Sequence, residues 1–491
     1  MTRNMIAFDL GASNGRAILG RFDGQRLEMR ELHRFENNYV EMNGVFYWDT
    51  PYLYSQLKQG LLAFRQGGFG QLDSFGIDTW GVDFGLLDKN GHLAGVPRSY
   101  RLGVQEDVDA VTAKIPAEEL YRRSGIDPSL TFNTLYQLHR RQREGDGALE
   151  IADKLLLTPD LLGYFLTGAV GTEYTIATTT QLYNPTARDW DWETIDQLGL
   201  PRHIFTPIQP SGTIRGQLRP ELCQELGLNP AAFVAVGSHD TASSVAAIPG
   251  QGSFAFCSSG TWSLFGVETD RPVLELGAGS GFSNEGTIQG GFRPLKNIIG
   301  LWIIQECRRD WQKEGKDLSW DDIVNEARGA APLRSIIDTD APEFYAGGDM
   351  VRKIRDYCAR TGQSVPETVG EIARCAYESL ALKYRKALEG LEGLEEMKGE
   401  AIQSLNIVGG GIQNKLLNQM AADATGRTVV TGPIEGAAMG NLLTQAMALG
   451  DIKDLEELRQ IVRGTVEVDT YTPNHSPEWE QAYRKLESMM K

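Results

Sequence analysis

Two aspartates stand at the ends of apolar, strand-like runs, where carboxylates can act on a bound ligand. Asp9 closes the run MIAFDL, and Asp240 closes the run AAFVAVGSHD. Transfer of a phosphoryl group to a hydroxyl needs a carboxylate that accepts the hydroxyl proton and Mg²⁺ that bridges phosphate oxygens. Asp240 is therefore the candidate base, and Asp9 is the candidate metal-binding residue. The alternative for either aspartate, a cap on the turn or helix that follows, stays open at this point.

Three glycine-containing turns directly follow apolar runs and can present backbone N–H groups to an anion. They are DLGASNGR (9–16), SSGTWS (258–263) and GGGIQN (409–414). Glycine permits a positive φ and a close approach, so that successive N–H groups converge on phosphate oxygens. Ser13 and Thr261 add hydroxyl donors. One such turn could simply join two elements, but three of them in both halves of the chain favour a nucleotide site.

Several other phosphate-binding and metal-binding motifs are absent from the sequence. It contains no P-loop GxxxxGK[ST], no Rossmann GxGxxG and no protein-kinase HRD. The six histidines stand singly, without HExxH, and the five cysteines form no CxxC. These patterns argue against a zinc site and against a disulfide framework, so buried free thiols are expected. The chemistry is therefore expected to rest on carboxylates.

The composition indicates two globular domains and excludes several classes of partner. A chain of 491 residues is longer than one ordinary core. The net charge of -17 argues against a nucleic-acid partner, which would need a basic surface. The N-terminal residues enter a strand pattern without a secretory signal, and no uninterrupted apolar run reaches the roughly 18 residues of a membrane span. We therefore expect a soluble, cytoplasmic protein without a membrane partner.

The first 80 residues predict a mixed sheet. Apolar runs separated by GASNG and DGQ predict three antiparallel strands over 5–10, 16–22 and 26–35. Helical spacing of leucines then predicts a helix over 52–64, and a strand is predicted over 74–80. This order of strands and helices is typical of an α/β layer architecture.

A related order returns in the second half of the chain. A strand over 253–259 meets a glycine turn and resumes, and a helix over 366–391 is followed by alternating strands and helices. The segment AAIPGQG supplies Pro and Gly near 245–252, where a domain boundary is expected. We predict two similar domains, 1–246 and 247–491, with residues 105–230 as helix-and-loop elaborations of the first.

The glycine turns resemble those of the FGGY carbohydrate kinases, within the actin-like ATPase superfamily. DLGASNGR looks like the first phosphate turn of that family, SSGTWS like the second, and IVGGGIQN like its adenosine-binding segment. The resemblance covers essentially the whole chain. It implies two ribonuclease-H-like domains, each a mixed sheet flanked by helices, with a cleft between them. It also implies ATP and Mg²⁺ as cofactors.

The resemblance carries specific roles onto residues of this sequence. It implies that the ATP phosphates are cradled by Ala12, Ser13, Asn14, Gly15 and Arg16. It implies nucleotide contacts from Thr261, Gln305 and Gly410. It implies sugar contacts from Gly81, His239, Asp240, Thr241 and Asn297. Asp240 is then the proton acceptor, and Asp9 contacts Mg²⁺ through a water. Each glycine could instead be a plain turn residue, and His239 could be a satisfied core residue.

Five longer segments resemble one ketose kinase within this family. They are GIDTWGVDFGLLD (76–88), FNTLYQL (132–138), EYTIATTTQLYN (173–184), SHDTAS (238–243) and LKNIIGLWIIQE (295–306). The resemblance implies ATP-dependent phosphorylation of L-rhamnulose at its 1-hydroxyl. A monomer is our separate expectation. The alternatives are a related kinase for another ketose or polyol, such as fuculose, xylulose or glycerol, and a sugar-independent actin-like ATPase. Asn14 departs from the family pattern, because a second serine can stand there.

Overall fold

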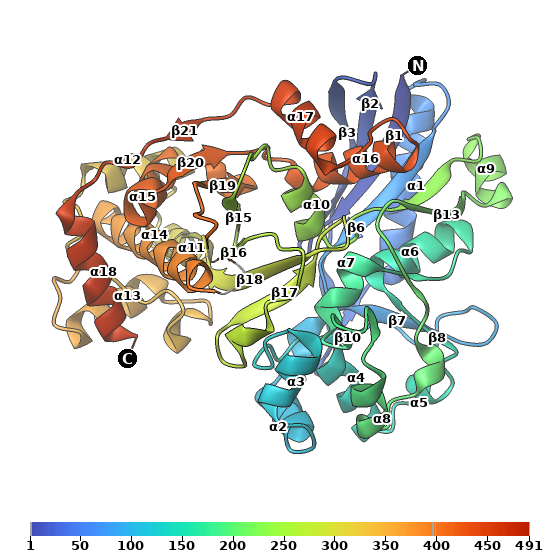
Figure 1. Ribbon diagram of the computed structural model, residues 1–491, viewed down its shortest axis with the longest axis horizontal. Coiled ribbons are helices and arrows are strands. Elements are labelled where there is room, and N and C mark those ends of the chain that lie inside the picture. The colour runs from blue at the N-terminus through green and yellow to red at the C-terminus, as the bar shows by residue number, and fades with distance from the viewer. Residues whose placement is uncertain (1, 395–396, 398, 491) are drawn as a thin grey trace. The chain divides into compact units, whose positions relative to one another are not determined.

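The computed structural model describes residues 2–394, 397 and 399–490, which form two compact units, each discontinuous in sequence (Figure 1). Unit 1 contains the residues up to Ala247, Glu268–Pro294 and Glu435–Val466. Unit 2 contains Ile248–Val267, Leu295–Ile434 and the residues from Glu467 on. Two stretches of the second half of the chain therefore fold with the first half.

A six-stranded mixed sheet forms the centre of unit 1. Its strands are β1 (Arg3–Leu10), β2 (Asn14–Phe22), β3 (Leu27–Glu36), β6 (Ser74–Thr79), β13 (Thr213–Gln217) and β14 (Ala232–Ala235). Their order across the sheet is β13-β14-β6-β1-β2-β3. β14, β6 and β1 run parallel, while β2, β3 and β13 pair antiparallel with their neighbours. The carboxyl ends of the three parallel strands therefore lie at one edge.

Helices cover both faces of this sheet because successive residues of β1 alternate between two apolar cores. The helices are α1 (Thr50–Gln66), α6 (Thr158–Thr167), α10 (Asp240–Ala246), α16 (Gly436–Ala448) and α17 (Leu455–Thr465). Ile6 and Phe8 pack with apolar residues of α1 and α6. Met5 and Ala7 pack with residues of α16 and α17 on the other face. Figure 1 shows the red helices α16 and α17 beside the blue N-terminal strands.

Unit 2 is built on a second mixed sheet with a similar plan. Its strands are β15 (Phe254–Ser259), β16 (Trp262–Gly266), β18 (Phe292–Ile299), β19 (Ser404–Val408), β20 (Thr428–Thr431) and β21 (Thr470–Tyr471). Their order is β18-β16-β15-β19-β20-β21, and β15, β19 and β20 run parallel. As in unit 1, the strands that come first along the chain (β15, β16 and β18) pair antiparallel, and later strands (β19 and β20) are added in parallel. The first residues of β18, up to Pro294, belong to unit 1.

The helices of unit 2 cover this sheet and end the chain. They are α11 (Trp302–Lys313), α12 (Trp320–Gly329), α13 (Met350–Arg360), α14 (Val369–Glu392), α15 (Lys415–Thr425) and α18 (Pro477–Met489). The long helix α14 begins with a capping box, in which Thr368 and Glu371 satisfy each other's backbone N–H groups. Among the described residues, no helix has both the length and the apolar character that a membrane crossing requires.

The predicted α/β class with two mixed sheets flanked by helices is confirmed. The three strands predicted before residue 36 correspond to β1, β2 and β3, and the strand over 253–259 corresponds to β15. The helix predicted over 366–391 is α14. The strand–helix alternation at the C-terminal end also exists, but its last helix, α16, packs on β1 and β6 of unit 1.

Residues 105–230 form mostly short helices, as predicted, but they also supply strands. Besides α6, the α-helices of this region are α2 (Gln105–Thr112), α3 (Ala117–Ser124), α4 (Thr134–Arg143), α5 (Gly147–Glu150), α7 (Tyr174–Ala177), α8 (Trp192–Leu198) and α9 (Pro220–Leu226). Short strands of unit 1 are β4 (Tyr39–Met42), β5 (Val45–Trp48), β7 (Phe84–Leu87), β8 (Lys154–Leu157), β9 (Thr172–Glu173), β10 (Tyr183–Asn184), β11 (Asp189–Trp190), β12 (Ile208–Gln209) and β17 (Phe282–Gly286). The sequence did not predict that β13 of this region joins the main sheet.

Candidate active site

The predicted site residues of unit 1 meet where the three parallel strands end. Asp9 on β1 is the register partner of Asp78 on β6. Thr79, the last residue of β6, donates its N–H to the carbonyl of Ser238 at 2.9 Å, just after β14. Because the carboxyl ends of parallel strands form one edge, Asp9 near the end of β1, Gly81 after β6 and Asp240 at the start of α10 lie along the same edge of this sheet.

Asp240 is the first residue of α10, and the residue in the N-cap position is His239. The Thr241 hydroxyl donates to Asp240 Oδ1 at 3.1 Å, and 31% of the Asp240 side chain is exposed. Burial raises the pKa of Asp240 above its ordinary value, His239 opposes that effect, and Asp9 adds to it. An accessible carboxylate with a raised pKa suits a proton acceptor better than a helix cap.

The first glycine turn joins β1 to β2 and is closed by its own backbone. The Gly11 N–H donates to the Asn14 carbonyl at 2.8 Å, and the Asn37 side-chain amide donates to the Gly11 carbonyl at 2.8 Å. Ala12 is half-buried, whereas Ser13 and Asn14 are exposed at the tip. This arrangement leaves the tip open to a ligand.

Gly15 and Arg16 follow the tip of this turn and have different surroundings. A Cβ on Gly15 would lie 2.3 Å from Cζ of Phe35, so no larger residue fits there without a shift of that ring. The Arg16 guanidinium donates to Asp9 Oδ2 at 2.5 Å and also pairs with Glu435. The side chain of Arg16 is therefore held by two carboxylates.

Asp78 is a charged residue of this edge that the sequence analysis did not single out. Its side chain is fully buried beside Asp9, and the Asn441 side-chain amide donates to Asp78 Oδ2 at 2.6 Å. Burial raises the pKa of Asp78 well above its ordinary value, and Asp9 raises it further. An aspartate inside the otherwise apolar strand SFGIDT was the signal that could have identified it.

The loop after β6 contains Gly81 and an unusual residue, Val82. Val82 has a φ of 68°, a left-handed conformation that is strained for a β-branched side chain. Its N–H donates to the Thr179 hydroxyl at 3.0 Å, and its carbonyl accepts from the Thr134 hydroxyl at 2.6 Å. Three of the five longer segments of the sequence therefore converge on this loop.

The buried side chain of Asp83 holds the same loop through hydrogen bonds. Its Oδ2 accepts hydrogen bonds from the indole nitrogens of Trp48 at 2.6 Å and Trp80 at 2.9 Å, and Gln137 donates to its Oδ1 at 3.1 Å. Burial raises the pKa of Asp83 to about 6. Trp80 is buried, with 6% of its surface exposed. These bonds fix the side chain of Trp80 and the loop that contains Gly81.

Glu173 supports the backbone that carries His239 and Asp240. Its Oε2 accepts hydrogen bonds from the Ser238 N–H at 3.2 Å and from the Thr175 hydroxyl at 2.6 Å. The His239 N–H in turn donates to the Thr175 hydroxyl at 3.2 Å. Glu173 and Thr175 lie in the segment EYTIATTTQLYN, so this segment positions the SHDTAS loop although 65 residues separate Glu173 from Ser238.

The predicted nucleotide residues of unit 2 also come together. β15 and β19 are parallel neighbours, so the turn after Ser259 lies beside the turn that starts at Gly409. Thr261 donates its hydroxyl to Gln305 Oε1 at 3.2 Å. Gly409 has a φ of 87°, and a Cβ there would lie 2.9 Å from the Ser259 carbonyl oxygen. Only glycine fits this contact between the two turns.

Gly410 and Asn297 complete the predicted residues in unit 2. Gly410 begins a short 3₁₀ helix, Gly410–Gln413, and is exposed. Asn297 lies on β18 opposite Leu264, three positions beyond Thr261 on the adjacent strand. Asn297 therefore belongs to unit 2, whereas the other predicted sugar-binding residues belong to unit 1.

Gly410→Ala is expected to raise the Kd for ATP about tenfold, or by about 1.4 kcal/mol, without lowering the melting temperature. A Cβ on Gly410 meets no atom within 4 Å, so any loss of affinity reports contact with the ligand. Titration calorimetry with ATP measures the change. Gly464→Ala is the matched control, because that exposed helical glycine also has open space around it. An unchanged Kd in Gly410→Ala would remove Gly410 from the nucleotide site.

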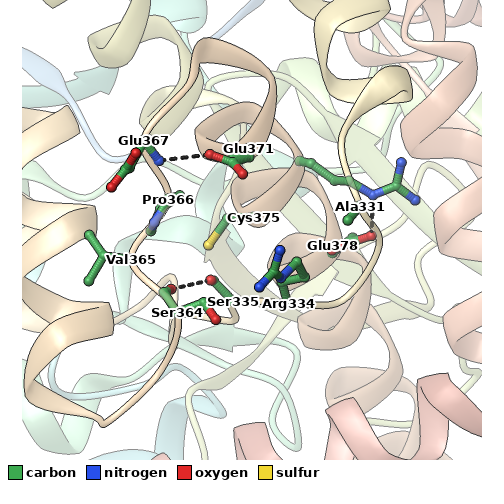
Figure 2. Close-up of a pocket in the computed structure, with 11 residues that line it drawn as sticks. Ala331, Arg334, Ser335, Ser364, Val365, Pro366, Glu367, Glu371, Cys375 and Glu378 are labelled. Carbon is green, nitrogen blue, oxygen red and sulfur yellow. Dashed lines mark hydrogen bonds and ion pairs between the residues drawn. The ribbon is translucent and has the colours of Figure 1, made fainter.

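A small cavity of about 100 Å³ in unit 2 contains none of the predicted site residues (Figure 2). Its walls come from the segments before and within α14, and Figure 2 shows Cys375 and Glu378 on the α14 side. All five cysteines are free thiols, as expected, and four of them are buried. Glu378 is 1% exposed, and it accepts hydrogen bonds from Arg374 Nε at 2.7 Å and from the Leu333 N–H at 2.8 Å.

The free energy of unfolding is expected to carry a pH dependence from Glu378, whose pKa burial raises to about 7 from 4.5. The folded state binds this proton more tightly, so the contribution is complete below pH 4.5 and is lost as the pH rises through 7. The loss amounts to about 3 kcal/mol. Urea titrations of the wild type and Glu378→Gln at several pH values measure it. Equal slopes in the two proteins would contradict this assignment.

Two family descriptions match the chain along most of its length. The N-terminal domain of the FGGY family of carbohydrate kinases matches residues 4–247, and the C-terminal domain matches residues 255–449. The chain is 42% identical to a rhamnulokinase of Bacteroides thetaiotaomicron over 98% of both chains. It is 39% identical to a rhamnulokinase of Oceanobacillus iheyensis over 95% of this chain and 97% of that one. A rhamnulokinase of Bacillus subtilis is 37% identical over 95% of each chain.

Solved structures of sugar kinases share the fold at low sequence identity. A ligand-bound xylulose kinase from Lactobacillus acidophilus superimposes with a TM-score of 0.82 at 16% identity, covering 99% of this chain and 96% of that one. A Plasmodium falciparum glycerol kinase with ADP superimposes with a TM-score of 0.81 at 13% identity, covering 100% and 98% of the two chains. At these identities the likeness extends to the fold alone.

Proposed function

Because the chain belongs to the FGGY family of carbohydrate kinases, we propose that it transfers the γ-phosphoryl group of ATP to the 1-hydroxyl of L-rhamnulose. The products are L-rhamnulose 1-phosphate and ADP, and the reaction is the kinase step of rhamnose catabolism. The observation that carries this proposal is the 42% identity to a rhamnulokinase over 98% of both chains. Identities of 39% and 37% to two further rhamnulokinases support it.

The proposed reaction is an in-line displacement with Asp240 as the base. The sugar 1-hydroxyl loses its proton to Asp240 as its oxygen forms a bond to the γ-phosphorus, and the bond from that phosphorus to the β–γ bridging oxygen breaks to release ADP. The raised pKa of Asp240 makes its carboxylate a better proton acceptor. Gly81, His239 and Thr241 contact the sugar in this proposal, as does Asn297 from unit 2.

ATP is proposed to bind through backbone groups rather than through a basic surface. At the exposed tip, the Ser13 and Asn14 carbonyls accept hydrogen bonds from the backbone N–H groups of Asn37 and Gly11. This arrangement supports phosphate binding by the N–H groups of Ala12, Ser13 and Asn14. The proposal includes the N–H groups of Gly15 and Arg16, whereas the Arg16 side chain stays with its two carboxylates. Thr261, Gln305 and Gly410 bind the nucleotide in unit 2.

The carboxylates of the candidate site are compatible with a Mg²⁺ ion whose ligands are mainly phosphate oxygens and water molecules. Among the described residues, no cluster of three or more His, Cys, Asp or Glu side chains could hold a metal ion. Mg²⁺ keeps several waters and often uses one or two carboxylates together with substrate phosphates. Asp9 offers one such carboxylate, with Oδ2 already bonded to Arg16. We propose a water-mediated contact from Asp9; when bound, Mg²⁺ neutralises charge on the phosphate oxygens.

The same proposal assigns the sugar-binding and nucleotide-binding residues to two sequence domains. The sequence domain 1–246 supplies the sugar-binding residues and the first phosphate turn, and the domain 247–491 supplies most of the nucleotide site. The compact units differ from this single cut, since residues 435–466 belong to unit 1. A cytoplasmic monomer remains our expectation for the working form of the enzyme.

ADP release, measured with a coupled assay, tests the proposed function on a panel of L-rhamnulose, L-fuculose, both xylulose enantiomers, glycerol and no sugar. We expect turnover with L-rhamnulose at a kcat/KM at least about tenfold above the other acceptors, because a few hydrogen bonds and one methyl group distinguish them. Preference for another acceptor would retain the kinase chemistry and reject L-rhamnulose. ADP release of equal rate without sugar would favour an ATPase.

A further inference from the structure

Asn37 is a buried polar residue directly after β3, and the proposed function assigns no role to its side chain. Asn14 on β2 is the register partner of Glu36, so the next residue, Asn37, comes beside the first glycine turn. Its backbone N–H donates to the Ser13 carbonyl at 3.0 Å, and its side-chain amide donates to the Gly11 carbonyl at 2.8 Å. Only 1% of Asn37 is exposed. One interior residue therefore holds the turn between β1 and β2 at two points.

The partner of the Asn37 side chain decides how its amide is oriented. A carbonyl oxygen accepts hydrogen bonds and cannot donate, so the side-chain nitrogen must face Gly11. An ionised aspartate has no donor and a leucine has no polar group, so neither side chain could make this bond, although both have a similar size. The contact therefore depends on the amide itself.

The two bonds also fix the direction in which N–H groups of the turn point. The Gly11 carbonyl shares a planar trans peptide unit with the Ala12 N–H, and the Ser13 carbonyl shares one with the Asn14 N–H. Within such a unit the C=O and the N–H point in opposite directions. Because both carbonyls face the buried Asn37, the two N–H groups face away from it.

The Asn37 amide also occupies the carbonyl that a turn ordinarily bonds to itself. In an ordinary β-turn, the carbonyl of the first residue accepts from the N–H of the fourth. Here the Asn37 amide donates to the Gly11 carbonyl, and the turn is closed in the other sense, by the Gly11 N–H donating to the Asn14 carbonyl at 2.8 Å. With the Gly11 carbonyl satisfied in this way, the Asn14 N–H is left for an anion.

We propose that Asn37 is a positioning residue for the ATP phosphates, whose side chain holds the Gly11–Ala12 peptide unit so that its N–H, and not its carbonyl oxygen, faces the phosphate oxygens. This inference rests on the proposed function, in which the first glycine turn binds the phosphates. Gly11 gives this peptide unit rotational freedom, because glycine accepts conformations that other residues avoid. Without the amide, the unit can rotate and present its carbonyl oxygen, which repels an anion.

Asn37→Leu tests this role, because it removes the side-chain donor without adding a charge and keeps the backbone N–H that bonds to Ser13. We expect the Kd for ATP, measured by titration calorimetry in the presence of Mg²⁺, to rise about tenfold, as the loss of one buried hydrogen bond implies. The Kd for adenosine, which has no phosphates, is expected to stay at the wild-type value. A general structural defect would instead weaken the binding of both ligands.

Two further variants separate the missing donor from bulk and from charge. Asn37→Ala removes the same donor with a smaller side chain, and it takes the place of Asn37→Leu if the leucine prevents folding. Asn37→Asp keeps the shape but adds a carboxylate beside the Gly11 carbonyl, so its Kd for ATP is expected to rise further. The matched control is Asn229→Leu, since the Asn229 amide donates to the Leu72 carbonyl at 2.7 Å, near the amino end of β6 and so at the opposite edge of the same sheet. Its Kd for ATP is expected to equal that of the wild type.

A wild-type Kd for ATP in a folded neutral variant of Asn37 would overturn the inference, as would equal losses of affinity for ATP and adenosine. A rise confined to Asn37→Asp would also overturn it, because charge alone would then explain the effect. Failure of the proposed function has a different signature: a wild type that binds ATP but phosphorylates no sugar would contradict that function, and the Kd comparison would still test Asn37. A wild type with equal Kd values for ATP and adenosine would remove the phosphates from this turn and overturn the inference.

Discussion

Asp240→Asn is expected to lower kcat for sugar phosphorylation by about 10²- to 10⁴-fold, the range over which a general base contributes. The amide has nearly the same shape and can still accept from the Thr241 hydroxyl, which bonds to Asp240 Oδ1 in the structure. It cannot accept a proton from the sugar. The loss should therefore appear in kcat, whereas the Kd for ATP and the melting temperature should change little. Coupled ADP release and titration calorimetry measure the two effects.

Asp270→Asn makes the same chemical change at an exposed aspartate of unit 1 and serves as the control. We expect its kcat to equal that of the wild type. If Asp240→Asn retained more than about a tenth of the wild-type kcat, Asp240 would not act as a general base. If ADP release were unaffected and did not require sugar, the protein would be an ATPase, and the sugar-binding roles of the same loop would be withdrawn.

Asp160→Asn is expected to lower the free energy of unfolding of unit 1 by about 3–5 kcal/mol, the usual cost of breaking a buried ion pair. Arg215 donates to Asp160, and the two side chains are 2% and 1% exposed. Nε and Nη2 of Arg215 already lack a hydrogen-bond partner within the described residues. Neutralising Asp160 leaves that cation buried without a counter-charge. The midpoint and slope of urea denaturation, followed by tryptophan fluorescence, measure the loss.

Asp196→Asn is the matched control for this stability prediction. Asp196 pairs with Arg202 at 2.7 Å, but the two side chains are 52% and 53% exposed. An exposed pair contributes at most about 1 kcal/mol, so the denaturation midpoint should move little. Equal shifts in Asp160→Asn and Asp196→Asn would show that the Asp160–Arg215 pair does not stabilise unit 1.

The Asp160 variant is also expected to raise the KM for the sugar. The Glu173 N–H donates to both oxygens of Asp160, at 3.2 and 3.4 Å. Glu173 in turn accepts from the N–H of Ser238, directly before His239. A defect at Asp160 can therefore reach the sugar-binding loop through a short chain of hydrogen bonds, although the two ends are far apart in sequence.

Features that depend on local sequence were predicted from it. Alternation of apolar residues identified β1, β2, β3 and β15, because a half-buried or fully buried strand leaves a local pattern. Glycine turns after strands identified the ends of β1, β15 and β19, since positive φ and close approach require glycine. Asp9 and Asp240 were recognised because each closes an apolar run, and the structure places both at one edge of the unit 1 sheet.

Features that depend on distant pairings were not predicted. Asp78 and Glu173 are charged residues whose surroundings depend on partners elsewhere in the chain. Asn441, for example, bonds to Asp78 across 363 positions. Helix α16 was predicted as a helix, but its amphipathic pattern does not tell which sheet it covers. It packs on β1 and β6 of unit 1 rather than in unit 2.

The sequence by itself therefore determined strands such as β1, β2, β3 and β15, the helix α14, the glycine turns and the two aspartates, because each leaves a signal within a few residues. Only the tertiary structure decided which carboxylates are buried together and which unit contains the helices α16 and α17. Those properties depend on electrostatic and packing contacts between segments that the order of residues does not bring together.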